Sequence, residues 1–137
     1  MLRFLIPAAG AGLAALTLQA CAPGEMMEPD MSVEAAETLA EYDFTGETRS
    51  CLSANRIDEI KPLDERHWLV ETVGGDMYLN RVSRGCNGAD RSFTYLQYEI
   101  PTGQLCRGEI VRVIDNGSNM SQGACGLGDY ERLTTIE

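Results

Sequence analysis

The sequence predicts an all-β fold, a small antiparallel barrel or sandwich of about six short strands, stapled by disulfides and preceded by a disordered acidic tether. Three observations carry this prediction. Short runs of β-branched and aromatic residues alternate with turn-forming residues from about residue 50 onward. Four cysteines are dispersed through the same region. Acidic residues without any basic ones fill the stretch before it, as in a solvated spacer.

The six expected strands are separated by recognisable turns. Gly74-Gly75-Asp76 and Pro101-Thr102-Gly103 are typical turn sequences, and Asp115 to Asn119 breaks another apolar run. No long amphipathic helix is indicated after residue 50. We therefore expect strands at residues 56–60, 67–73, 77–82, 92–100, 105–114 and 129–135.

The cysteines of this region predict two disulfides. A chain of under ninety residues buries a limited core, and exported domains of this size are commonly stapled. In an up-and-down meander, Cys51 and Cys106 lie at one end of the sheet, whereas Cys86 and Cys125 lie at the other. We predict these two pairings, which a Greek-key crossing would reshuffle. The wide spacing disfavours a zinc site, so no metal is expected there.

Residues 1–20 are typical of a lipoprotein signal peptide. Arg3 precedes an apolar run that reaches Leu18 without another charge. That run is short for a membrane-spanning helix, and Pro7 and two glycines weaken it further. Ordinary secretion, with cleavage after an Ala-x-Ala-like site, is the alternative.

Leu18-Gln19-Ala20-Cys21 resembles the lipobox of bacterial lipoproteins. The resemblance implies that Cys21 is the lipidation site and carries a diacylglyceryl group, and that acyl chains anchor the protein to the membrane. Two or three chains hold a protein almost permanently, at about 0.8 kcal/mol per buried methylene. By the sorting rule of this class, Ala22 in place of Asp implies the outer membrane, at its periplasmic face.

Residues 21–48 comprise the lipidated cysteine and the expected tether, and residues 49–137 the β-rich disulfide domain. Pro23, Gly24 and Pro29 favour an extended spacer. Its acidic residues all precede the first basic one, Arg49; they are Glu25, Glu28, Asp30, Glu34, Glu37, Glu41, Asp43 and Glu47. Ser32 can cap a short helix over residues 33–42, either transient or docked.

The charge balance excludes two classes of partner. Removal of residues 1–20 takes away Arg3 and no acid, so the net charge of −10 becomes −11. Nucleic-acid binding depends mainly on Lys and Arg at phosphates, so no nucleic-acid partner is expected. Anionic lipid headgroups are disfavoured for the same reason.

Three tether methionines suggest an alternative function. Met26, Met27 and Met31 offer soft thioether ligands, and export brings them within reach of Cu(I). A copper-handling lipoprotein is therefore the alternative hypothesis. Methionines without a nearby His or Cys are more commonly flexible spacer residues.

Few residues are candidates for catalysis. His67, the only histidine, is expected on the surface of a strand, and no G-x-S-x-G turn raises a serine nucleophile. The pairs Asp58-Glu59 and Asp64-Glu65 do not make a shared carboxylate site by themselves, because neighbours on a strand face opposite ways. Three arginines could line one surface or simply offset nearby acids; they are Arg107, Arg112 and Arg132. We expect no enzyme and no cofactor.

Several short motifs resemble a family of small Gram-negative lipoproteins that share a domain of unknown function. They are Cys51, Tyr78-Leu79-Asn80 before Cys86, Leu105-Cys106-Arg107-Gly108-Glu109 and Cys125-Gly126-Leu127-Gly128. The resemblance covers about residues 50–133 and implies export and a cysteine-framed domain, but no activity. The expected function is therefore a lipid-anchored envelope lipoprotein acting as a protein-interaction or structural module, with another envelope protein as the possible partner.

Overall fold

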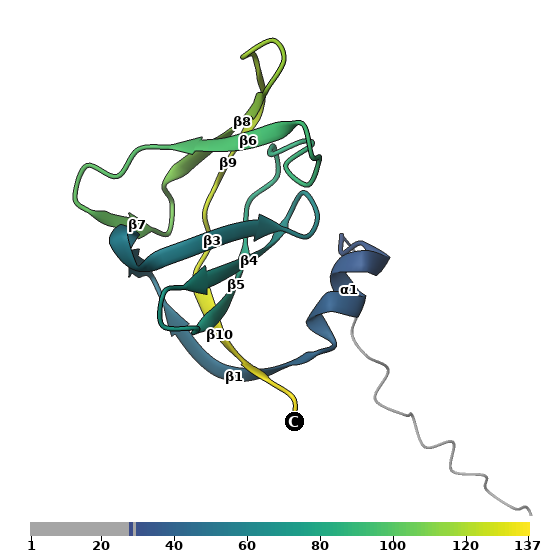
Figure 1. The fold of residues 1–137 in the computed structure, drawn as a ribbon, viewed down its shortest axis with the longest axis vertical. Helices are drawn as coiled ribbons and strands as arrows, with labels where there is room; N and C mark the ends of the chain where they lie inside the picture. Colours follow the sequence, from purple (N-terminus) through teal and green to yellow (C-terminus); the bar gives the residue numbers. More distant parts are fainter. Residues whose placement is uncertain (1–27, 29) are drawn as a thin grey trace, which may run out of the picture.

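The all-β prediction is confirmed by the computed structural model, which describes Glu28 and residues 30–137 (Figure 1). The described part contains one short helix, one 3-10 turn and ten strands rather than six. In order they are α1 (Val33–Leu39), β1 (Tyr42–Arg49), β2 (Cys51–Ser53), η1 (Ala54–Arg56), β3 (Ile57–Pro62), β4 (His67–Thr72), β5 (Met77–Arg81), β6 (Thr94–Tyr98), β7 (Gln104–Cys106), β8 (Ile110–Asp115), β9 (Ser121–Gly126) and β10 (Tyr130–Thr135).

The strands form three antiparallel sheets. The largest has the order β1-β10-β5-β4-β3, a second has the order β6-β8-β9, and β2 pairs with β7. In Figure 1 the strands β6 and β8 lie above β3, so the two larger sheets stack, and α1 stands beside β1 and β4. The meander is right for the neighbours β3-β4-β5 and for the pairing of β6 with β8. It is wrong for the last strand, because β10 lies between β1 and β5, and β9 takes the place beside β8.

Apolar side chains are buried on both faces of the five-stranded sheet. Along β4, Trp68 belongs to the cluster shared with the β6-β8-β9 sheet, which includes Val111 and Val113. The next residue, Leu69, belongs to a cluster under the helix. Because successive side chains of a strand face opposite ways, β4 is covered on both sides, which explains why five of its six residues are buried.

The short helix α1 is docked on the domain. Ser32 Oγ accepts the Ala35 N–H at 3.1 Å, as predicted for its N-cap, and the helix ends at Leu39 instead of continuing to residue 42. Ala35 and Leu39 are 0% and 4% exposed and pack with Leu69 and Leu79. Burial of these two side chains stabilises a helix that would be marginal alone in water.

The tether expected at residues 21–48 differs from the structure in its second half. Strand β1 occupies residues 42–49 and pairs with β10, from Tyr42 opposite Thr135 to Arg49 opposite Tyr130. The folded unit therefore begins well before residue 49. Strand β1 was not predicted because it is an edge strand whose side chains are mostly exposed and polar, without an alternating apolar pattern.

Both predicted disulfides are confirmed. Cys51–Cys106 joins β2 to β7, where the two residues stand directly opposite each other. Cys86–Cys125 joins the loop after β5 to β9 and is almost fully buried. The pairs are correct although the setting differs from the meander, because β2 and β7 form a sheet of their own and Cys125 lies within β9.

Two further differences concern the strands near the C-terminus. The run expected at residues 105–114 is divided into β7 and β8 by a turn at Gly108, whose φ of 86° favours glycine. Strand β9 was not predicted, since Gly, Ala and Ser have low β propensity. Its Gly123 lies so close to the Gly85 carbonyl that a side chain there would collide with it.

Candidate functional site

The first described residues are held on the domain by a network of charged contacts, which we call the N-terminal clasp (Glu28, Asp30, Ser32, Asp64, Arg66, His67, Arg81 and Arg84). Glu28 accepts hydrogen bonds from Arg81 Nε at 2.8 and 3.0 Å, and its Oε2 lies 3.1 Å from His67 Nε2. Arg81 also contacts Glu131 at 2.5 Å. These contacts fix the position at which the chain enters the fold.

The second half of the clasp involves Asp30 and Ser32. Asp30 Oδ2 lies 2.6 Å from Arg66 Nη1 and 2.8 Å from Arg84 Nη2. The Ser32 N–H donates to Asp64 Oδ2 at 2.9 Å, just before α1 begins. The clasp thus joins the entry of the chain to the β4–β5 hairpin and to the loop that precedes β4.

Asp64 is the buried centre of the clasp. Its Oδ1 accepts the N–H groups of Arg66 and His67 at 2.8 and 2.7 Å, and lies 2.9 Å from His67 Nδ1. Burial works to raise the pKa of Asp64, but the N–H donors of Ser32, Arg66 and His67 outweigh it and hold that pKa below the ordinary value. The carboxylate therefore stays ionised and stabilises the turn.

Glu28 shows the same balance at the other end of the network. Burial works to raise its pKa, but the hydrogen bond and the positive charge of Arg81, followed by His67, lower it below the ordinary value. Arg81 in turn has a raised pKa, since Glu28 and Glu131 outweigh the effect of its burial. Glu28 and Arg81 are thus both stabilised in their charged forms.

The prediction of a surface position for His67 is wrong. The residue is 3% exposed and lies between Asp64 and Glu28, so each ring nitrogen has a carboxylate partner. Sequence reasoning missed this cluster because Glu28 lies 39 positions away. The one available signal was the pairing of Asp64 with His67 three positions later, across a tight turn.

Ser32, Asp64 and His67 lie together without forming a nucleophilic relay. Ser32 Oγ caps α1 by accepting from the Ala35 N–H, and both nitrogens of His67 face carboxylates instead of a hydroxyl. A serine nucleophile requires a base within hydrogen-bond reach of its hydroxyl. These three side chains instead hold the start of the described chain on the domain.

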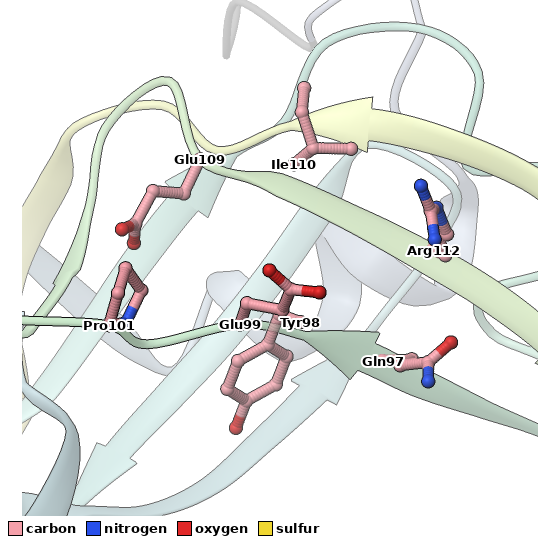
Figure 2. Close-up of a pocket in the computed structure, with 7 residues that line it drawn as sticks. All are labelled: Gln97, Tyr98, Glu99, Pro101, Glu109, Ile110 and Arg112. Carbon is pink, nitrogen blue, oxygen red and sulfur yellow. The ribbon is translucent and has the colours of Figure 1, made fainter. Parts of the chain in front are cut away.

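A shallow pocket of about 310 Å³ lies on the β6-β8-β9 sheet (Figure 2). Gln97 of β6 stands opposite Arg112 of β8 in the strand register. Figure 2 shows the Glu109 carboxylate directed toward Pro101, and Tyr98 between that end and Gln97. Glu109 Oε2 also accepts the Cys106 N–H at 2.6 Å, so this carboxylate closes the β7–β8 turn.

The three arginines singled out from the sequence do not act together. Arg107 pairs with Asp129 at 3.2 Å, and Arg132 pairs with Asp76 at 2.9 Å, while Arg112 lines the pocket of Figure 2. The acids that lie next to them in the sequence, Glu109 and Glu131, bind other groups. These contacts are of the kind that join neighbouring strands at the surface.

The structure also shows the contacts of the acidic residues singled out from the sequence. Asp115 Oδ1 accepts the N–H groups of Gly117 and Ser118 at 2.9 and 2.8 Å, which confirms the turn predicted there. Those hydrogen bonds, above all from Ser118, lower the pKa of Asp115. Asp58 and Glu59 are exposed on the edge strand β3.

A larger groove, which we call the α1 groove, lies between the helix and β1. It has a volume of about 750 Å³, and Glu28, Glu37, Arg81 and Glu131 provide its polar lining. Arg81 also stands over the Phe44 ring, 5.8 Å from its centroid. The apolar lining comes from α1, from β1 and from residues that flank the helix; it consists of Met31, Val33, Ala36, Leu39, Ala40, Tyr42 and Phe44.

The structure describes one of the three methionines of the copper hypothesis. Met31 is partly buried against the apolar cluster under α1, whereas Met26 and Met27 lie outside the described residues. Within Glu28 and residues 30–137, no group of three or more His, Cys, Asp or Glu side chains is arranged to hold a metal ion. Metal binding by the methionines stays a prediction.

Comparisons with known proteins add no relative. A scan against family models, a search of curated proteins and a search of solved structures each found no match to this chain. The resemblance to small Gram-negative lipoproteins therefore stays a prediction. In the described part of the chain, no helix has the length and apolar character needed to cross a membrane.

Proposed function

We propose that this protein is an exported lipoprotein anchored by acyl chains on Cys21. One observation carries the proposal. Of the five cysteines in the chain, Cys51, Cys86, Cys106 and Cys125 are consumed in two disulfides. Cys21 is the remaining cysteine and is therefore available for acylation. It stands at the end of an apolar run in a lipobox-like sequence. Two disulfides in so short a domain also favour an oxidising compartment.

The proposed location is the periplasmic face of the outer membrane. Ala22 follows Cys21, where Asp would imply retention at the inner membrane. The acyl chains are the proposed membrane contact, since α1 is seven residues long and packs on the domain. Anchoring by two or three chains is effectively stable.

The proposed role of the folded part is non-enzymatic. The polar side chains gathered in the described region fasten the chain to itself: Asp64 closes a turn, Glu28 and Asp30 pair with arginines, and Glu109 closes another turn. A rigid module on a lipid anchor suits protein interaction in the envelope. The α1 groove offers such a module an open surface with an apolar lining.

Intact-mass measurement of the protein isolated from cell envelopes tests the anchor and the disulfides together. The expected mass corresponds to a chain beginning at Cys21 with acyl groups attached, and reduction adds two hydrogens for each of the two disulfides. The matched control is Cys21→Ser, which keeps the disulfide signature and loses the acyl mass. A native chain that begins at Met1, lacks lipid and contains five free thiols contradicts the proposal.

Fractionation of the two membranes tests the location. The wild-type protein is expected with the outer membrane, and Ala22→Asp is expected to move it to the inner membrane. The Cys21→Ser variant serves as the control, because it cannot be anchored by acyl chains in either membrane. An acylated wild-type protein found with the inner membrane contradicts the sorting argument alone.

A further inference from the structure

The α1 groove leaves large apolar side chains in contact with solvent. Val33 on the helix is 66% exposed, and Phe44 on β1 is 45% exposed. Each square ångström of apolar surface removed from water contributes roughly 25 cal/mol. A groove of about 750 Å³ between these two elements is large enough for several side chains of a partner.

The rim of the groove is acidic. Glu28, Glu37 and Glu131 line it, and its one cationic lining residue, Arg81, already pairs with Glu28 and Glu131. The segment that forms both walls, residues 33–47, contains five acidic residues and no basic one; they are Glu34, Glu37, Glu41, Asp43 and Glu47. An occupant with apolar side chains and positive charge fits this surface.

We propose that the α1 groove docks a basic amphipathic segment of another envelope protein, its apolar residues against Val33 and Phe44 and a Lys or Arg at Glu37. The inference deepens the proposed interaction role and rests on it. Docking an amphipathic helix into an apolar groove is a recurring recognition mode. The acidic rim accelerates encounter with a basic segment and sets its orientation.

Two other occupants fit less well. A fatty acid brings a carboxylate to a rim with three glutamates and one arginine that is already paired. A second copy of this chain brings further negative charge, since the net charge of the protein is −10. Both arrangements place like charges together, which opposes binding.

The experiment uses the full chain from cell envelopes in phosphatidylcholine nanodiscs, with empty nanodiscs as the blank. The probe is a fluorescein-labelled 18-residue peptide with Leu at helical spacing and Lys elsewhere, followed by anisotropy at 0.15 M salt, where charges more than about 8 Å apart are largely screened. We expect wild-type binding in roughly the micromolar range. A peptide with Ser in place of every Leu is expected to bind at least tenfold more weakly.

Two variants test the site itself. Ala40→Trp fills the groove from an exposed position, and Glu37→Lys reverses the rim charge; each is expected to weaken binding at least tenfold. The matched controls are Gln122→Trp on β9 and Asp58→Lys on β3, the opposite edge of the large sheet from β1. Both controls are expected to bind like the wild type, and circular dichroism checks that all four variants are folded.

Several outcomes overturn the inference. They are wild-type binding no stronger than to empty nanodiscs, equal binding of the Leu and Ser peptides, folded Ala40→Trp that binds normally, or displacement of the peptide by palmitate at equal concentration. A chain that proves unlipidated is assayed free in solution. Intact mass tests the proposed lipid anchor, and anisotropy tests peptide binding to the α1 groove. Each proposal can therefore fail without the other.

Discussion

Replacement of Asp64 by Ala tests the clasp most directly. The substitution removes the acceptor of three backbone N–H groups and of one ring nitrogen, with contacts of 2.7 to 2.9 Å. The Asp64 side chain is 8% exposed, so water replaces little of what is lost. A hydrogen bond to a charged group is worth roughly 1.5–3 kcal/mol, and the contacts are not additive. We expect the free energy of unfolding to fall by about 2–4 kcal/mol at pH 7.

The effect of Asp64→Ala depends on pH in a direction fixed by the lowered pKa of Asp64. The unfolded carboxyl, with a pKa of about 3.9, binds a proton more readily than the folded one. Stability from Asp64 is therefore fully present above pH 4 to 5 and is lost as the pH falls through the folded pKa. The difference between wild type and variant is expected to shrink in that acidic window.

Urea unfolding of wild type and variant, repeated from pH 7 down to pH 2.5, measures this difference. Asp58→Asn, exposed on the edge strand β3, is the control and is expected to change stability by less than about 0.5 kcal/mol. A loss below about 0.5 kcal/mol for Asp64→Ala, or one that stays constant down to pH 2.5, would refute the reasoning.

Three other changes have calculable effects, each measured by denaturant unfolding. Replacing both cysteines of either disulfide by Ala is expected to cost about 4 kcal/mol, because the closed loops of 39 and 55 residues differ little in the entropic model; two losses that differ several-fold would contradict it. Leu79→Ala, at a fully buried position in the cluster under α1, is expected to cost about 2–5 kcal/mol, and a loss under 1 kcal/mol would mean that the site is not packed. Gly123→Ala is expected to be more damaging than Gly74→Ala, because only the first places a new methyl against a backbone carbonyl and neither glycine has a positive φ; equal losses would sink that argument.

The sequence predicted those parts of the fold that have local causes. The turns at Gly74-Gly75 and Asp115 need particular residue types, and the helix cap needs Ser32, so each can be identified within a few positions. Strand β9 has no such signal, because its Gly123 is selected by close approach of the Gly85 loop. Strand β1 likewise depends on β10, about ninety positions later.

The clasp shows why the candidate site was hidden. Asp64 and His67 are close in sequence, but their partners Glu28 and Ser32 arrive from the segment expected to be a tether. The acidic character of that segment was noted, and it favours a solvated spacer when considered alone. The structure shows this part of the segment docked instead of solvated. Glu28 and Asp30 are drawn onto the domain by the positive charge of three arginines, Arg66, Arg81 and Arg84.

The clasp also determines how far the domain can stand from its proposed anchor. A chain extends by at most about 3.6 Å per residue, so the seven residues from Cys21 to Glu28 span at most about 25 Å. A tether reaching residue 49 would have allowed about 100 Å. Glu28 belongs both to the clasp and to the α1 groove, so the Glu28 edge of the groove lies within the shorter distance of the proposed anchor. For a lipoprotein anchored at Cys21, as proposed, the partner segment is therefore expected close to the membrane surface.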